Sequence, residues 1–175
     1  TVKCRHNNGR ETARVLANHF QNNTMIDTIV CLDGTELIGA FMAEFLADTG
    51  IMSINSGKNI SIITPDVNAY GQLVFMDSTL RMIKHMQVLV LAASVTTGQT
   101  ITRAAEAVSY YGGTVRGVAA IFSNVEQTAE GMEIFSIFQK EDLPDYQAYL
   151  PSECPMCRKK MPIDAIVNSF GYSKL

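Results

Sequence analysis

The stretch that decides the fold is residues 88–100, which read Val88-Leu89-Val90-Leu91-Ala92-Ala93-Ser94-Val95-Thr96-Thr97-Gly98-Gln99-Thr100. The first four residues are a continuous apolar run, which is typical of a parallel strand covered on both faces. Small and hydroxyl-bearing residues follow. Apolar residues with helical spacing then begin at Ile101 and continue at Ala104, Ala105 and Val108. The segment predicts a buried strand, a short loop and a helix in direct succession.

The loop between this strand and this helix has the composition of a phosphate-binding site. Helix N-termini present unpaired N–H groups and a partial positive charge, and both attract anions. Gly98 lets the backbone approach a ligand closely, and threonine hydroxyls can donate to phosphate oxygens. A threonine-capped helix without a ligand has the same composition, so the loop alone leaves both interpretations open. The residues predicted to surround a phosphate are Ser94, Thr96, Thr97, Gly98, Gln99 and Thr100.

Strand and helix patterns alternate along most of the chain, which predicts a mostly parallel sheet covered on both sides. Ligands of such sheets bind beyond the carboxyl ends of the strands, here the loops after Leu32 and Leu91. Residues 65–81 lack a sustained period and predict a long loop. Pro162 is expected to open a last helix that ends at Gly171. The other expected strands are 28–32, 59–64, 115–122 and 133–138, and the other expected helices are 13–20, 37–46 and 101–111.

In this order the segments resemble the type I phosphoribosyltransferases, and among them the orotate phosphoribosyltransferases. Residues 88–100 are similar to the family's motif for phosphoribosyl diphosphate (PRPP), and Asp33-Gly34-Thr35 stand where the family has its pyrophosphate loop. The resemblance spans roughly residues 9–140. It implies an α/β fold with a central, mostly parallel sheet flanked by helices, and a small hood from residues 65–81 and the chain ends. It also implies Mg²⁺ as a cofactor, PRPP or a nucleoside monophosphate as ligand, a role in nucleotide metabolism, and a homodimer.

The chain departs from the family pattern at three places. Ala92 and Ala93 replace two acidic residues that bind the ribose hydroxyls in the family, Ser123-Asn124 replace an Asp-Arg pair that reads orotate, and residues 65–81 contain no lysine. We therefore expect phosphate-ligand binding with very weak or undetectable orotate transfer. Two functions stay open: a divergent, Mg²⁺-dependent phosphoribosyltransferase, and a non-catalytic sensor or regulator that holds a phosphoribosyl ligand. The catalytic residues are not identified by the sequence.

Cysteines near both ends of the chain suggest a second site. Cys154 and Cys157 have the Cys-x2-Cys spacing of a zinc knuckle, and Cys4 and His6 offer two further donors. Together they would make a tetrahedral Cys3His site that ties the chain ends. Surface thiols and a redox pair are alternatives for the same residues. Cys31 lies in an apolar run and is expected in the core.

Composition bounds the remaining possibilities. The 175 residues fit one domain, 1–175, and the chain is 47% hydrophobic and 18% charged, which argues against disorder. The net charge is −3 and the longest basic run is residues 158–160, so we expect no nucleic-acid binding. No apolar run has the length of a membrane span, and we expect no signal peptide. Four cysteines are too few for a secreted disulfide scaffold, which favours a cytoplasmic location.

Overall fold

The computed structural model describes residues 2–48, 53–150, 152–168 and 171–175, and a five-stranded sheet forms its centre. The strand order is β2-β1-β5-β6-β7, and every neighbouring pair is parallel. The predicted central parallel sheet is therefore confirmed. The strands are β1 (Thr28–Cys31), β2 (Ser61–Ile63), β5 (Gln87–Val95), β6 (Thr114–Ser123) and β7 (Phe135–Gln139).

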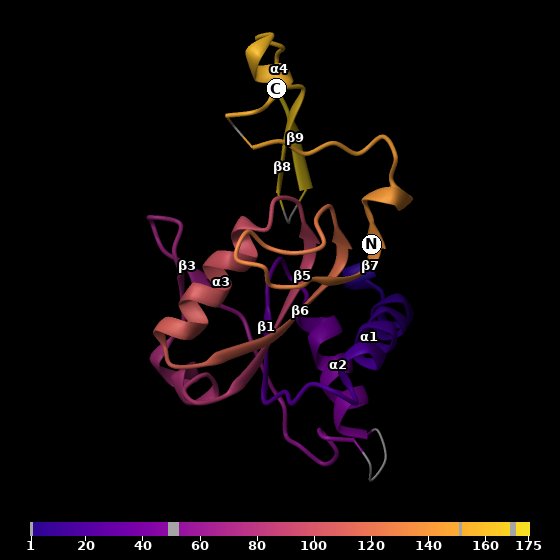
Figure 1. Ribbon diagram of the computed structural model, residues 1–175, viewed down its shortest axis with the longest axis vertical. Coiled ribbons are helices and arrows are strands. Elements are labelled where there is room, and N and C mark those ends of the chain that lie inside the picture. The colour runs from indigo at the N-terminus through magenta and orange to yellow at the C-terminus, as the bar shows by residue number, and fades with distance from the viewer. Residues whose placement is uncertain (1, 49–52, 151, 169–170) are drawn as a thin grey trace.

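Helices cover both faces of this sheet (Figure 1). On one face lie α1 (His6–Phe20) and α2 (Glu36–Asp48), which follow a short 3-10 turn, η1 (Val2–Cys4). On the other face lies α3 (Gln99–Tyr110). Each layer buries its own apolar core against the sheet, because the strands carry apolar side chains on both sides. No helix within the described ranges has both the length and the hydropathy to cross a membrane.

The register of the two central strands brings the predicted loops together. Thr28 of β1 lies opposite Val88 of β5, and Cys31 lies opposite Leu91. The two strands therefore stay in register up to the end of β1, and the N–H of Leu32 donates to the carbonyl oxygen of Leu91 at 2.8 Å. The loop that begins at Asp33 consequently emerges beside the last residues of β5.

The predicted long loop, residues 65–81, folds as a small hairpin beside α3. Its strands are β3 (Asp66–Val67) and β4 (Leu73–Val74), and a 3-10 helix, η2 (Asp77–Met82), follows. Phe75 is buried, and its ring packs edge-on against Tyr111 at a centroid distance of 5.6 Å. This contact anchors the hairpin to the end of α3.

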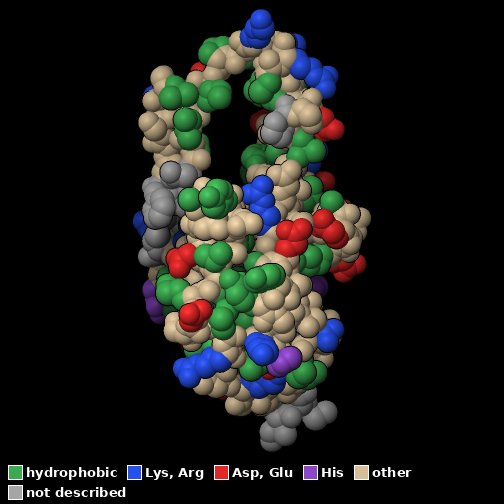
Figure 2. Space-filling model, turned by 90° about the vertical axis from the view of Figure 1, so that its left-hand side faces the viewer, with side chains coloured by type: hydrophobic (Ala, Val, Ile, Leu, Met, Phe, Trp, Pro, Cys, Tyr) green, Lys and Arg blue, Asp and Glu red, His purple; other side chains and the backbone are tan. Residues whose placement is uncertain are grey.

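Residues 140–175 form a C-terminal arm that projects from the sheet (Figure 1). The arm contains η3 (Lys140–Asp142), α4 (Pro155–Arg158) and the antiparallel hairpin of β8 (Ala165–Asn168) and β9 (Gly171–Lys174). The helix predicted from Pro162 to Gly171 is therefore wrong over its described residues; residues 169 and 170 lie outside them. Ile166 and Val167 are β-branched, which favours a strand over a helix. Figure 2 shows hydrophobic side chains exposed along the arm. Val167 and Tyr172 are 74% and 69% exposed.

Candidate functional site

The loop after β1 is held in an unusual backbone conformation. Asp33 and Gly34 have φ angles of 57° and 73°, in the left-handed region that asparagine, aspartate and glycine tolerate best. Thr35 is fully buried, and its hydroxyl donates to the carbonyl oxygens of Leu32 at 2.8 Å and Leu91 at 3.2 Å. The predicted pyrophosphate loop is thus fixed to the end of β5, and Thr35 stabilises it from inside.

The loop after β5 also turns through a left-handed residue. Gly98 has a φ of 80° and is the N-cap of α3, so residues 94–97 reach the helix N-terminus through a tight turn. A Cβ built at Gly98 would lie 3.5 Å from the Cα of Thr128, in ordinary van der Waals contact. The backbone conformation, rather than a lack of space, is therefore what favours glycine at this position.

Asn124, the first residue after β6, holds this turn in place. The backbone N–H of Asn124 donates to the carbonyl oxygen of Val95 at 2.8 Å, and its side-chain amide donates to the carbonyl oxygen of Thr96 at 3.2 Å. The hydroxyl of Ser123 donates to the carbonyl oxygen of Val125 at 2.6 Å. Of the two residues that stand where the resemblance expects an Asp-Arg pair, Asn124 therefore supports the loop after β5, whereas Ser123 supports the turn that follows β6. The side-chain oxygen of Asn124 is buried and has no partner.

The two loops line one small cavity at the carboxyl end of the sheet. Its volume is 30 Å³, about the volume that one water molecule occupies in the liquid. Such a space suits the oxygens of an anion better than a whole nucleotide. Thr35 is not among the lining residues because it is buried below them. The cavity is lined by Asp33, Ala92, Ser94, Val95, Thr96, Thr97, Gly98, Gln99, Thr100 and Ile101.

Ala92 and Ala93 differ in their environments, although the sequence pairs them. Ala92 is 1% exposed and belongs to the core under α3, with Val90 and Ile101. Ala93 is only half-buried. An acidic side chain at position 92 would therefore enter the apolar core, whereas one at position 93 would have access to solvent. Sequence reasoning could not see this difference, because it depends on which face of β5 each side chain occupies.

Lys3 is a functional candidate that the sequence did not reveal. Its ammonium group donates to the carbonyl oxygen of Asp33 at 2.5 Å, and it lies 3.7 Å from the position of a Cβ at Gly34. A cation beside the predicted pyrophosphate loop suits an anionic ligand. Lys3 precedes α1 and is 30 residues away in sequence, so no local motif could have connected it to this loop.

The carboxyl group of Asp33 is in a mixed environment. Burial raises its pKa above the ordinary value of 3.8, while the ammonium group of Lys3 and a hydrogen bond from the backbone N–H of Ala93 oppose that rise. The carboxyl group thus reaches across from the β1 loop to β5. It is a carboxylate acceptor in contact with the segment where the family's acidic pair is missing.

The side chains at this cavity fit a magnesium ion, the cofactor that the resemblance implies. Mg²⁺ prefers oxygen ligands and is commonly bound by one or two carboxylates together with substrate phosphates and water. Asp33 supplies a carboxylate, and Ser94 and Thr96 supply hydroxyl oxygens on the same cavity. The donor set is therefore of the right chemical type when a phosphorylated ligand completes it.

The predicted zinc ligands are not gathered into one site. His6 lies in α1, where its ring packs edge-on against Phe41. Cys154 is the N-cap of α4 and Cys157 lies within α4, on the projecting arm (Figure 1). The described residues contain no group of three or more His, Cys, Asp or Glu side chains that could hold a metal. The side chain of Cys4 lies outside the described residues. The predicted Cys3His site is therefore not assembled, because the chain ends lie apart.

Cys154 and Cys157 nevertheless interact with each other. The backbone N–H of Cys157 donates to the sulfur of Cys154 at 3.4 Å. This hydrogen bond, with a second one from the Cys157 thiol, lowers the pKa of Cys154, and the same thiol contact raises the pKa of Cys157. Both thiols are free. Cys31 is buried, as predicted, and burial raises its pKa to about 12.

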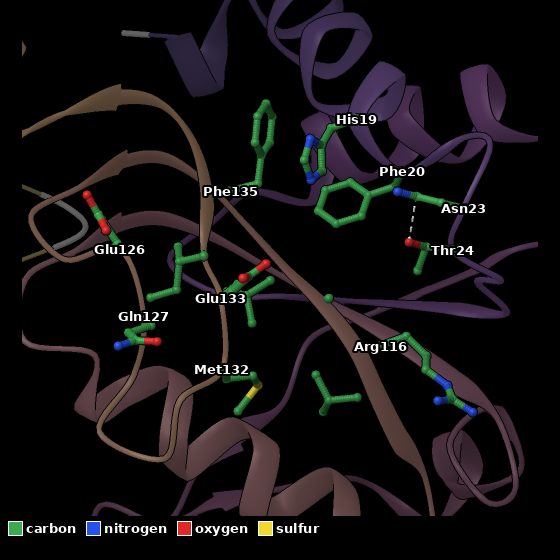
Figure 3. Close-up of a pocket in the computed structure, with 14 residues that line it drawn as sticks. His19, Phe20, Asn23, Thr24, Arg116, Glu126, Gln127, Met132, Glu133 and Phe135 are labelled. Atoms are coloured by element: carbon green, nitrogen blue, oxygen red, sulfur yellow. Dashed lines mark hydrogen bonds between the residues drawn. The ribbon is translucent and has the colours of Figure 1, made fainter.

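A larger hollow, of 640 Å³, lies elsewhere on the molecule (Figure 3). His19 and Phe20 of α1 and Phe135 of β7 lie together along one side of it, and the rings of His19 and Phe135 stack at a centroid distance of 3.8 Å. Arg116 lies at its other end. The hollow follows the first half of β6, before the pairing with β7 begins at Ala119. Since ligands of parallel sheets bind beyond the carboxyl ends, we place the candidate site at the two loops.

The chain was compared with known protein families and with curated proteins. No protein-family model matches it. The orotate phosphoribosyltransferase of Chlorobaculum parvum is 35% identical over 80 residues, which are 45% of this chain. The match spans 39% of that relative's length.

Solved structures show a similar architecture over most of the chain. The Mycobacterium tuberculosis orotate phosphoribosyltransferase, solved in complex with PRPP, has a TM-score of 0.58 at 19% identity and covers 81% of this chain and 79% of its own. A phosphoribosyltransferase from Corynebacterium diphtheriae has a TM-score of 0.56 at 20% identity, with 81% and 85% covered. The adenine phosphoribosyltransferase of Thermoanaerobacter pseudethanolicus has a TM-score of 0.57 at 16% identity, with 76% and 80% covered. The chain therefore has the fold of the type I phosphoribosyltransferases, and over 80 residues its sequence is similar to an orotate phosphoribosyltransferase.

Proposed function

We propose that the chain binds PRPP or a nucleoside 5′-monophosphate, with the 5′-phosphate held by residues 94–100. The observation that carries this proposal is the cavity at the N-terminus of α3, where Gly98 adopts the left-handed conformation that opens the helix. A helix N-terminus with hydroxyl side chains around it binds phosphate through N–H groups and its partial positive charge. The similarity to a structure solved with PRPP supports the same ligand class.

The proposal assigns the pyrophosphate end of PRPP to Asp33, Gly34 and Thr35. Lys3 adds a positive charge at this loop, and the hairpin of β3 and β4 would act as the hood. Mg²⁺, held by Asp33 and by ligand oxygens, would neutralise charge that develops on departing pyrophosphate. The homodimer and the cytoplasmic location expected from the sequence stay predictions and belong to this proposal.

The alternative is a sensor that binds the same ligands without catalysis. Asn124 favours it, because this residue supports the phosphate loop instead of offering a base-reading cation. We therefore expect very weak or undetectable orotate transfer. Following orotate consumption with PRPP and Mg²⁺ tests this expectation. Wild-type turnover in the usual enzymatic range, ~1–1000 s⁻¹, would show that the chain is an ordinary orotate enzyme.

Substitution of Gly98 by glutamate tests the phosphate site directly. The side chain would force a residue disfavoured at positive φ into the turn and place a carboxylate against the incoming anion. We expect the affinity for PRPP, measured by isothermal titration calorimetry, to fall at least about tenfold.

Gly57→Glu is the matched control for that substitution. Gly57 also has a positive φ, 71°, and a Cβ there meets no atom within 4 Å. This variant tests the cost of the backbone strain and of the added charge away from the cavity. Unchanged PRPP affinity in Gly98→Glu, or an equal loss in Gly57→Glu, would contradict the assignment.

A further inference from the structure

Because the acidic pair is missing, residues 92 and 93 offer no hydrogen-bond acceptor for the ribose of a phosphoribosyl ligand. A phosphoribosyl ligand carries two ribose hydroxyl groups, and Ala92 and Ala93 cannot accept hydrogen bonds through their side chains. Ala92 lines the cavity but is 1% exposed and packs in the core under α3, so position 92 offers a ligand little room for a polar side chain. If a carboxylate holds the ribose, it comes from another segment.

Asp33 lies where such a carboxylate is needed. It lines the cavity together with Ala92 and Ser94, although it comes from the other loop. The backbone N–H of Ala93 is near enough to its carboxyl group to lower the pKa of that group, so the carboxyl group lies beside the part of β5 where the pair is missing. An aspartate carboxylate has more acceptor sites than this one contact uses, which leaves capacity for ligand hydroxyls.

The backbone around Asp33 supports a functional role rather than a purely structural one. Asp33 is one of three non-glycine residues with positive φ in the described part of the chain. Residues in such sparsely populated conformations cluster at ligand sites, where the surrounding structure holds them in place. Lys3 holds Asp33 in this conformation, because its ammonium group donates a hydrogen bond to the carbonyl oxygen of Asp33.

We propose that Asp33 accepts hydrogen bonds from the ribose hydroxyls of the bound phosphoribosyl ligand and so replaces the acidic pair absent at positions 92 and 93. This inference rests on the proposed function, because it needs the phosphate to be seated at residues 94–100. It assigns the ribose contact to the loop after β1 instead of to β5. Lys3 is a positioning residue in this arrangement, since it fixes the backbone that carries the carboxylate.

The test compares three ligands that differ only in the sugar: inorganic phosphate, 2-deoxyribose 5-phosphate and ribose 5-phosphate. Titration calorimetry in the presence of a metal chelator removes any contribution from a divalent cation. A hydrogen bond to a charged group is worth about tenfold or more in affinity. We therefore expect wild-type protein to bind ribose 5-phosphate about tenfold more tightly than the deoxy sugar.

Asp33→Asn is the informative variant. Asparagine has the same size, tolerates positive φ and keeps an acceptor for the Ala93 N–H, but it carries no charge. The preference for ribose 5-phosphate should fall severalfold or more, while the affinity for inorganic phosphate stays unchanged or rises. Asp48→Asn is the control, because Asp48 is exposed at the far end of α2, about 18 Å along the helix from Glu36. Asp33→Gly, which also suits the positive φ, is the second variant should Asp33→Asn fail to fold.

The outcomes separate this inference from the function it rests on. A wild-type protein that binds phosphate but shows no preference for ribose overturns the role of Asp33 and leaves the phosphate site intact. An equal preference in the wild type and in Asp33→Asn and Asp33→Gly overturns it as well. A wild-type protein that binds none of the three ligands contradicts the proposed function itself.

Discussion

Strand β1 begins and ends beside an aspartate, and the two aspartates have opposite environments. Asp27, before the strand, binds the ammonium group of Lys58 at 2.6 Å and accepts the backbone N–H of Gln87 at 3.0 Å. Burial opposes ionisation there, but these hydrogen bonds outweigh it and lower the pKa. At Asp33, after the strand, burial dominates and the pKa is raised. The protein compensates the burial of the Asp27 carboxylate fully, whereas it compensates that of Asp33 only in part.

The difference between the two aspartates is consistent with the proposed ligand site at the carboxyl end of the sheet. At the amino end, Asp27 joins β1 to β5 and to the turn before β2, so its charge contributes to stability. At the carboxyl end, Asp33 is held at positive φ with a disfavoured charge, and a ligand could relieve that cost. Stored strain and incomplete pairing are common where a protein gives up stability for function. The following predictions test this contrast, from the largest expected effect to the smallest.

An aspartate introduced near the carboxyl end of β5 should be tolerated only on the face of the strand that is open to solvent. Ala92→Asp would bury an unpaired charge in the core beside Val90, and we expect a loss of about 3 kcal/mol or more in unfolding free energy. Ala93→Asp places the same group at a half-buried position and should cost less than about 1.5 kcal/mol. Urea unfolding of both variants measures the difference. Equal losses would mean that the two faces of β5 are not distinct.

Asp27→Asn should destabilise the fold without affecting ligands. The substitution removes the charge that Lys58 pairs with and weakens the bond from Gln87. Because both side chains of the pair are 27% exposed, we expect a moderate loss, about 1 to 2 kcal/mol. Urea unfolding gives the stability, and phosphate titration serves as the control. A loss of phosphate affinity in a folded variant would contradict the structural role.

Asp33→Asn should behave in the opposite way. Removing a charge that burial disfavours should leave the free energy of unfolding unchanged or raise it by less than about 1 kcal/mol. Thermal unfolding of the ligand-free protein provides the measurement. A clear drop in stability would show that Asp33 is a structural residue like Asp27, and the contrast would then fail.

Acid titration should reveal the same contrast as a small effect, below about 1 kcal/mol for Asp33. The raised pKa of Asp33 means that its contribution to stability is full below the ordinary value of 3.8 and is lost as the pH rises through the folded value. The lowered pKa of Asp27 means that its contribution is present above 3.8 and is lost only as the pH falls through its folded value. The free energies of unfolding of both asparagine variants, measured from pH 3 to 7, should therefore approach that of the wild type as the pH falls. Asp33→Asn should approach it from above and Asp27→Asn from below.

Sequence reasoning predicted the body of this protein better than its arm, for a physical reason. The strand at Val88–Leu91 and the loop that follows could be predicted because a continuous apolar run indicates a buried strand, and the residue types of the loop indicate a turn. The arm has little core, and the apolar spacing of Ile163, Ile166 and Val167 fitted a helix although the residues form or adjoin a hairpin. Periodicity is informative only where a buried face imposes it.

The placement of the two loops of the candidate site could be predicted from the sequence for the same reason, whereas their function stays a prediction. Loops that follow neighbouring parallel strands must meet at one edge, so Asp33 and Gly98 could be paired from topology alone. The roles of Lys3 and Asn124 depend on contacts between segments that are 30 and 28 residues apart. The burial of Ala92 depends on the twist and register of β5. None of these is expressed in a local pattern.

The position of the arm has a consequence for the order of events during synthesis. The last strand of the sheet ends at Gln139, and the loops that line the cavity precede it. Domains generally fold as units during synthesis, and the five-stranded sheet contains no strand from the arm. The sheet and its ligand loops can therefore close before the ribosome has finished the arm. A phosphorylated ligand could engage the nascent protein at that stage.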